Sequence, residues 1–201
     1  MVAILDYDAG NIKSVEKAFK FLGADVVTTR DEAEIARADH VVLPGVGAFG
    51  DAMSKLNEYK LVDVIKKTVE SDVPFIGICL GLQLMFDSSE ESEGVDGLGI
   101  FRGKIRRIPQ ANGLKVPQIG WNDLNYAKKG RLFEGVPEHS FVYFVHSYYL
   151  DAMDKDIVTA TTDYGVKVEA SVEKGNVFAC QFHPEKSSEV GMQILKNFLE
   201  V

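Results

Sequence analysis

Short apolar runs alternate with helical spacing through the first half of the chain. Four runs have the apolar, β-branched composition of buried strands: residues 2–6, 25–28, 40–43 and 74–78. Apolar residues recur every three or four positions along residues 12–22 and 51–70, which predicts helices, and residues 31–38 form an acidic segment. Strands separated by helices in this way predict a parallel sheet.

After residue 90 the pattern changes to strand-like segments joined by polar turns. These segments are residues 98–108, 116–124, 139–150, 157–162, 166–172 and 176–182. A closing helix is expected over residues 187–199, where Val190, Ile194, Leu195 and Phe198 fall on one face. We therefore predict an α/β fold with a central, mainly parallel sheet flanked by helices and with additional antiparallel strands in the C-terminal half.

The composition favours one globular domain. The chain has 201 residues, of which 46% are hydrophobic, so we expect a single domain over residues 1–201. Its net charge of -8 argues against nucleic acid as a partner, because phosphates attract basic surfaces. We expect no secretory leader, and Pro74, Gly77 and Gln83 interrupt the longest apolar stretch, residues 73–86. These features predict a cytoplasmic protein without membrane contact, in which both cysteines are free.

The segment GICLG at residues 77–81 is the first candidate for chemistry. It places Cys79 where an apolar strand gives way to a helical pattern, which is the context of a nucleophile elbow. Glycines on both sides permit a tight turn, and a helix N-terminus favours the reactive thiolate. The backbone N–H of Leu80 is then expected to point toward a developing oxyanion. Taken alone, Cys79 also fits a small buried apolar residue.

A second segment, QFHPE at residues 181–185, contains a histidine and an acid that could activate a cysteine nucleophile. Residues two apart in an extended chain project to the same face, so His183 and Glu185 are expected to lie side by side. Glu185 can then fix the tautomer of the imidazole, which leaves the other ring nitrogen for the proton of Cys79. A surface histidine and a solvated acid are the alternatives for the two residues taken singly.

The segments GICLG and QFHPEKS together resemble the triad, or class I, glutamine amidotransferases. Within that family, four further segments are similar to the glutaminase subunits of imidazole glycerol phosphate synthases: DYDAGN at 6–11, LPGVGAFGDAM at 43–53, QIGWN at 118–122 and YFVHSYY at 143–149. The resemblance covers nearly the whole chain. It implies the three-layer fold of the family and glutamine hydrolysis. The sequence contains no CxxC or HExxH pattern, so we predict no metal, and we expect no cofactor.

The resemblance also implies roles for individual residues. Cys79 becomes the nucleophile, His183 the general base and acid, and Glu185 the residue that orients it. The oxyanion would be held by Val46, Gly47 and Leu80. Contacts with the substrate, L-glutamine, would come from Gly45, Gln83, His146, Ser147 and Tyr148, the last three largely through the backbone.

A partner is implied as well. Glutaminases of this kind form a heterodimer with a (β/α)8-barrel cyclase subunit, which uses the ammonia to form imidazole glycerol phosphate in histidine biosynthesis. Asn11 and Lys186 match family positions at or near that interface, although a helix cap or a solvated charge also explains such residues. An imperfectly placed turn at Val46 would hold the enzyme nearly idle, because losing one oxyanion donor costs about 2.7–4 kcal/mol.

Several alternatives remain open at this stage. Residues 45–50 match the GxGxxG pattern of nucleotide sites, but the next strand ends at Cys79 rather than at an acid. The chain is alternatively a glutaminase subunit of another amidotransferase, a different Cys/His hydrolase such as a peptidase, or a regulatory subunit without activity. His146 is more simply a structural histidine than a second base, and Cys180 fits a buried apolar residue.

Overall fold

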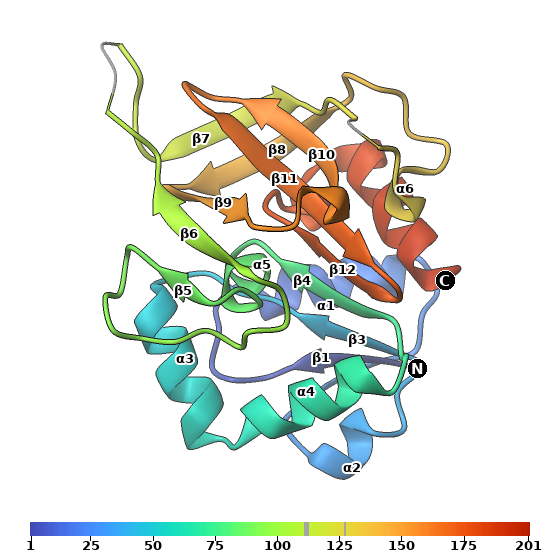
Figure 1. Cartoon of the computed structure of the whole chain (residues 1–201). Helices are drawn as coiled ribbons and strands as arrows, with labels where there is room; N and C mark the ends of the chain where they lie inside the picture. Colours follow the sequence, from blue (N-terminus) through green and yellow to red (C-terminus); the bar gives the residue numbers. More distant parts are fainter. Residues whose placement is uncertain (111–112, 127) are drawn as a thin grey trace.

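A seven-stranded sheet forms the centre of the molecule (Figure 1). The computed structural model describes residues 1–110, 113–126 and 128–201. In spatial order, the strands are β10 (Val158–Asp163), β11 (Lys167–Lys174), β12 (Val177–Cys180), β4 (Phe75–Ile78), β3 (His40–Leu43), β1 (Val2–Leu5) and β2 (Val26–Thr29). The five strands from β12 to β2 are parallel, and β10 and β11 extend the sheet antiparallel. The mainly parallel sheet predicted from the alternation is confirmed.

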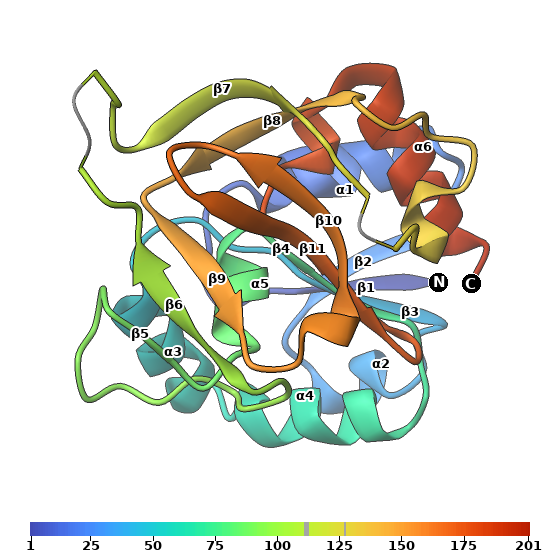
Figure 2. The same cartoon turned by 45° about the horizontal axis from the view of Figure 1, so that its top comes forward.

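Helices cover both faces of this sheet, which gives three layers (Figures 1 and 2). Side chains alternate along β1, so Ala3 and Leu5 pack into one core and Val2 and Ile4 into the other. The first core includes α2 (Glu32–Ile35), α3 (Phe49–Glu58), α4 (Leu61–Glu70) and α5 (Leu80–Leu84). The second includes α1 (Ile12–Phe21) and α6 (Ser188–Leu199).

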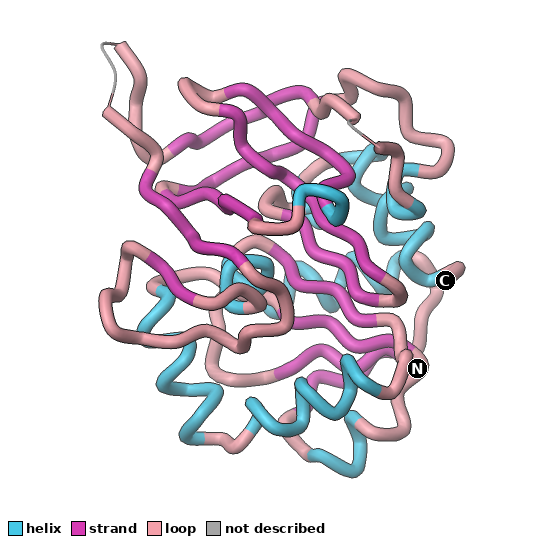
Figure 3. The backbone as a smooth tube through the Cα atoms, in the orientation of Figure 1, coloured by secondary structure: helices cyan, strands magenta, loops and turns pink. Residues whose placement is uncertain are grey.

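Two small sheets pack beside β10 and β11 (Figure 3). One contains β5 (Ser88–Ser89), β6 (Gly103–Arg107) and β9 (Tyr148–Ala152), and the other pairs β7 (Gln118–Asp123) with β8 (Phe141–His146). Three short 3-10 helices complete the fold: η1 (Arg131–Phe133), η2 (Lys155–Ile157) and η3 (Pro184–Lys186). None of the helices in the described residues is long and apolar enough to cross a bilayer.

Three element boundaries differ from the predictions. The amphipathic stretch 51–70 is two helices, because Lys60 adopts a left-handed conformation with φ 57° between α3 and α4. The expected strand 139–150 divides at Ser147, where the chain leaves its pairing with β7 and begins to pair with β6. The expected strand 98–108 is confined to residues 103–107.

Candidate active site

Cys79 occupies a sharp turn between β4 and α5. Its backbone has φ 57° and ψ -107°, and such conformations cost about 1–3 kcal/mol in a non-glycine residue. The neighbouring glycines make the turn possible. A Cβ on Gly81 would lie 2.0 Å from the carbonyl oxygen of Leu43, and one on Gly77 would lie 2.6 Å from the sulfur of Met85. The structure therefore contains the glycine-flanked turn expected from the sequence.

His183 and Glu185 form a buried pair. Nδ1 of His183 lies 2.7 Å from Oε1 of Glu185, and the two side chains are 1% and 0% exposed. The two side chains are in contact as predicted, but the extended backbone from which we predicted the contact is wrong. Strand β12 ends at Cys180, and Glu185 lies in the 3-10 helix η3. The chain turns at Pro184, and this turn brings the carboxylate back to the imidazole.

Asn11 makes a second hydrogen bond to the same carboxylate. Its Nδ2 donates to Oε1 of Glu185 at 2.6 Å. The backbone of Asn11 has φ 71°, a region in which Asn is enriched over other non-glycine residues. The sequence analysis placed Asn11 at a partner interface or at a helix cap, and it does precede α1, although its side chain makes no capping hydrogen bond. Because 174 residues separate it from Glu185, no local pattern could have shown this contact.

The neighbours of His183 favour its protonated form. Burial opposes the charged imidazole, but Cys79 and Glu185 outweigh it and raise the pKa of His183 to about 9. Nε2 of His183 is buried and has no hydrogen-bond partner among the described residues, which leaves it available to the sulfur. A protonated imidazole beside a cysteine stabilises the thiolate, the nucleophilic form of that side chain.

The turn of residues 44–47, after β3, faces the elbow. The backbone N–H of Leu80 donates to the carbonyl oxygen of Gly45 at 3.3 Å. We expected this N–H to point toward an oxyanion, and in this conformation the carbonyl occupies it instead. Val46 is 38% exposed, and Gly47 has φ 107°, a conformation that favours glycine.

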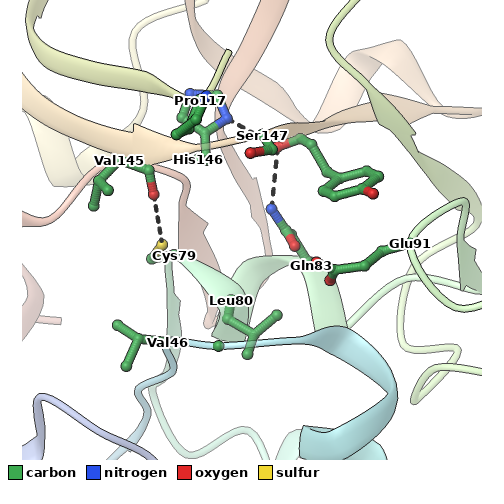
Figure 4. Close-up of a pocket in the computed structure, with 11 residues that line it drawn as sticks. Val46, Cys79, Leu80, Gln83, Glu91, Pro117, Val145, His146 and Ser147 are labelled. Atoms are coloured by element: carbon green, nitrogen blue, oxygen red, sulfur yellow. Dashed lines mark hydrogen bonds between the residues drawn. The ribbon is translucent and has the colours of Figure 1, made fainter.

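A cavity of about 290 Å³ opens beside Cys79 (Figure 4). The predicted site residues that line it are Val46, Gly47, Cys79, Leu80, Gln83, His146, Ser147 and Tyr148. Gly45 is not part of the lining, which also includes Glu91, Pro117 and Val145. Residues from five separate regions of the sequence therefore meet at one small cavity.

Two polar side chains in the wall are held by other protein groups. Nε2 of Gln83 donates to the carbonyl oxygen of Tyr148 at 3.1 Å and to Oε1 of Gln181 at 3.0 Å. His146 has both ring nitrogens hydrogen-bonded, to the carbonyl oxygen of Tyr148 at 2.8 Å and to Gln118 at 2.9 Å. Burial lowers the pKa of His146 to about 4, so the ring is neutral near pH 7. This geometry agrees with a structural role for His146.

Residues 3–201 match the family described as glutamine amidotransferase class-I. The chain belongs to this family. Two relatives named imidazole glycerol phosphate synthase subunit HisH are similar to it almost end to end. The protein from Bacillus cereus (strain G9842) is 52% identical over 198 residues, which cover 98% of this chain and 93% of the relative. The protein from Moorella thermoacetica is 48% identical over 200 residues, covering 100% and 94%.

Solved structures confirm the fold of this amidotransferase. A structure described as a glutamine amidotransferase superposes with a TM-score of 0.77 at 22% identity, covering 99% of this chain and 97% of its own. PurLQS from Thermotoga maritima gives a TM-score of 0.76 at 21% identity with the same coverage. The three-layer arrangement predicted from the resemblance is confirmed.

The glycine pattern of residues 45–50 does not form a phosphate cradle in this amidotransferase. The N–H of Phe49 at the start of α3 donates to Oε2 of Glu91 at 2.8 Å, and that of Gly50 donates to the hydroxyl of Ser92 at 3.0 Å. Two N–H groups at the start of α3 are thus occupied by side-chain acceptors and are not free for a phosphate. Glu91 is also a site residue that the sequence prediction missed, because it lies in a polar loop without periodicity.

Two remaining predictions concern Lys186 and Cys180. Lys186 lies in η3, directly after Glu185, and is exposed. Its exposure leaves it accessible to a partner. Cys180 is fully buried, and burial raises its pKa above the ordinary value, so it has the properties of a core residue rather than of a nucleophile.

Proposed function

We propose that this amidotransferase is the glutaminase subunit of an imidazole glycerol phosphate synthase, which hydrolyses L-glutamine and supplies ammonia to a cyclase subunit in histidine biosynthesis. The buried His183–Glu185 pair beside the strained turn at Cys79 is the observation that carries the chemistry. The subunit assignment rests on the 48% and 52% identity to HisH proteins.

Hydrolysis begins when the Cys79 thiolate attacks the side-chain carbonyl carbon of glutamine. A C–S bond forms, the carbonyl electrons move to oxygen, and a tetrahedral oxyanion results. As the C–N bond breaks, protonated His183 gives its proton to the departing nitrogen, so ammonia leaves and a thioester remains. Neutral His183 then takes a proton from water, whose oxygen attacks the thioester carbonyl carbon and gives a second oxyanion. When this oxyanion collapses, the C–S bond breaks, glutamate leaves, and the Cys79 thiolate beside protonated His183 is restored. Glu185 holds Nδ1 throughout, so Nε2 carries the proton.

The cavity offers complementary groups for an amino acid. Glu91 supplies a carboxylate to the lining, and Figure 4 draws Glu91 and Val145 on opposite sides of the view. A carboxylate there suits the α-ammonium group of glutamine. Ser147 and Tyr148 line the same cavity, and backbone N–H donors from this segment would suit the α-carboxylate. Glutamine bound in this way would direct its side chain toward Cys79.

The occupied N–H of Leu80 supports control of this activity by a partner. While the Gly45 carbonyl accepts that N–H, the oxyanion lacks a donor. Rotation of the peptide between Gly45 and Val46 would withdraw the carbonyl and turn the N–H of Val46 toward the elbow. One rearranged peptide would thus supply two donors, and removing a single donor typically costs about 2.7–4 kcal/mol.

An apolar face on β7 and β8 is suited to the cyclase subunit. Ile119, Trp121 and Phe141 are 64%, 50% and 57% exposed and lie on one face of the two strands. This face adjoins the active site. Trp121 packs edge-on against Tyr143, whose carbonyl oxygen accepts the N–H of His183 at 2.9 Å. Asn11 and Lys186 lie beside the same catalytic segment.

Glutamate formation by the purified chain, alone and with a candidate cyclase subunit and its ligand, tests the proposed function. Wild-type protein should release little glutamate alone and much more with the cyclase. Cys79→Ala should abolish hydrolysis in both cases, whereas the control Cys180→Ala should retain it, because that thiol is buried away from the cavity. Substantial turnover by Cys79→Ala, or no stimulation in a verified complex, would contradict the proposal.

A further inference from the structure

The hydroxyl of Tyr7 binds the start of the turn that faces Cys79. Tyr7 follows β1, is 2% exposed, and donates to the carbonyl oxygen of Pro44 at 2.6 Å. Burial and the negative charge of Cys79 raise the pKa of Tyr7 above its ordinary value. The hydroxyl therefore remains a hydrogen-bond donor throughout the neutral and mildly basic pH range.

The same hydroxyl fixes the position of Gly45. A Cβ on Gly45 would lie 2.5 Å from the oxygen of Tyr7 and 2.9 Å from Cβ of Leu80. The α-carbon of Gly45 is thus held between Tyr7 and the start of α5. Gly45 is also the residue whose carbonyl occupies the N–H of Leu80.

The hydrogen bond of Tyr7 is compatible with both orientations of the next peptide. Rotation of the peptide between Gly45 and Val46 changes ψ of Gly45 and φ of Val46. It leaves the Pro44 carbonyl in place, because that group belongs to the preceding peptide. Tyr7 therefore holds the fixed end about which the peptide turns.

A second residue of the same segment contacts the other end of this peptide. A Cβ on Gly10 would lie 2.7 Å from Cγ2 of Val46, so the Val46 side chain packs directly on the backbone of Gly10. The segment of residues 7–10 thus contacts the turn on both sides of the peptide that must rotate.

We infer that Tyr7 is a positioning residue for oxyanion stabilisation, and that its hydrogen bond to Pro44 sets where the N–H of Val46 is delivered. Tyr7 is absent from the lining of the cavity and contacts no reacting atom. The inference rests on the proposed function. Wild-type protein that fails to hydrolyse glutamine with the cyclase would overturn that function, whereas the variants below test Tyr7 alone.

Tyr7→Phe removes only the hydroxyl, so the test compares its kinetics with those of wild type. In the complex with the cyclase, kcat for glutamine hydrolysis should fall by about tenfold, the effect of weakening one hydrogen bond in the transition state. KM should stay within about twofold, because Tyr7 does not contact the cavity. Alkylation of Cys79 by iodoacetamide should keep its wild-type rate, since that reaction requires the thiolate but no oxyanion donor.

Tyr59→Phe is the matched control. Its hydroxyl donates to the carboxylate of Asp8, on the outer side of the same segment, so this change also removes one phenolic hydrogen bond. It should leave kcat within twofold of wild type, and thermal unfolding should verify that both variants are folded. Wild-type kcat in Tyr7→Phe, an equal loss in Tyr59→Phe, a raised KM with unchanged kcat, or slowed alkylation would each overturn the inference.

Discussion

At the scale of single residues, Oε1 of Glu185 accepts two hydrogen bonds. One comes from His183 and the other from Asn11, at 2.7 and 2.6 Å. Oε2 of the same carboxylate is buried without a hydrogen-bond partner among the described residues. The position and charge of this acid therefore depend on its two donors.

Removing the charge of Glu185 should change the pH dependence of hydrolysis. The thiolate–imidazolium pair is lost when His183 deprotonates, so the basic limb of kcat/KM should lie near pH 9 in the wild type. Glu185 raises that pKa, so Glu185→Gln should move the limb to lower pH and reduce the maximum by at least about tenfold. A pH–rate profile with an unmoved basic limb would exclude Glu185 as the partner of His183.

Changing Asn11 should separate its hydrogen bond from its backbone conformation. Asn11→Gly removes the donor without strain at φ 71°, and Asn11→Asp places a second carboxylate next to Glu185. We expect kcat/KM to fall severalfold in Asn11→Gly and further in Asn11→Asp. The measurement uses the complex at saturating cyclase, so weaker docking does not contribute. Equal kcat/KM in wild type, Asn11→Gly and Asn11→Asp would show that Asn11 does not support the triad.

The residues that the sequence identified share local patterns. Cys79 lies between glycines, and His183 and Glu185 are two positions apart, so both features are readable in a short window. Asn11, Tyr7 and Glu91 reach the site through contacts between distant segments, which no periodicity records. The orientation of one peptide at Gly45 is likewise set by tertiary packing.

At the scale of elements, β8 connects the apolar face to the catalytic histidine. The N–H of Tyr143 donates to the hydroxyl of Ser187 at 2.9 Å, and that hydroxyl donates to the carbonyl oxygen of His183 at 2.6 Å. The N–H of His183 returns to Tyr143. Any displacement of β8 would therefore act directly on the segment that carries the base.

The close approach of α5 to β3 predicts a large cost for a methyl group. Gly81→Ala would place Cβ 2.0 Å from a backbone carbonyl, which has no side-chain freedom to relieve the clash. We expect the free energy of unfolding to fall by about 2 kcal/mol or more. Gly175→Ala is the control, since its Cβ meets nothing within 4 Å and only its φ of 58° costs about 1–2 kcal/mol. Urea unfolding of both variants checks this; equal losses would contradict it.

The sequence predicted the types of most elements, but it could not predict where an element changes its partner. The apolar residues Leu56, Tyr59 and Val62 follow one another at intervals of three, so nothing in the spacing marks the left-handed Lys60 between α3 and α4. Strand character likewise continues through Ser147, where the pairing passes from β7 to β6. The break at Ser147 follows from which sheet each half of the segment joins, and the break at Lys60 allows α3 and α4 to pack as separate helices in one core. Both are properties of the assembled fold.

At the scale of the whole molecule, the exposed face of β7 and β8 predicts where a partner docks. Ile119→Glu should raise the Kd for the cyclase by about tenfold or more, because a charge would be buried in an apolar contact. Met153→Glu, at a position that is 72% exposed just after β9, should leave the Kd unchanged. Titration of labelled cyclase measures both, and equal Kd values would place the interface elsewhere.

The hydrogen bond from Leu80 to Gly45 also affects how much glutamine a cell loses to copies of this protein that have no partner. Under the proposed function, a molecule without a partner keeps that bond and spares the cellular supply of glutamine. Newly synthesised copies that await assembly, or copies in excess over the cyclase, therefore release little ammonia into the surrounding fluid. The two subunits then need no strict matching in their rates of synthesis.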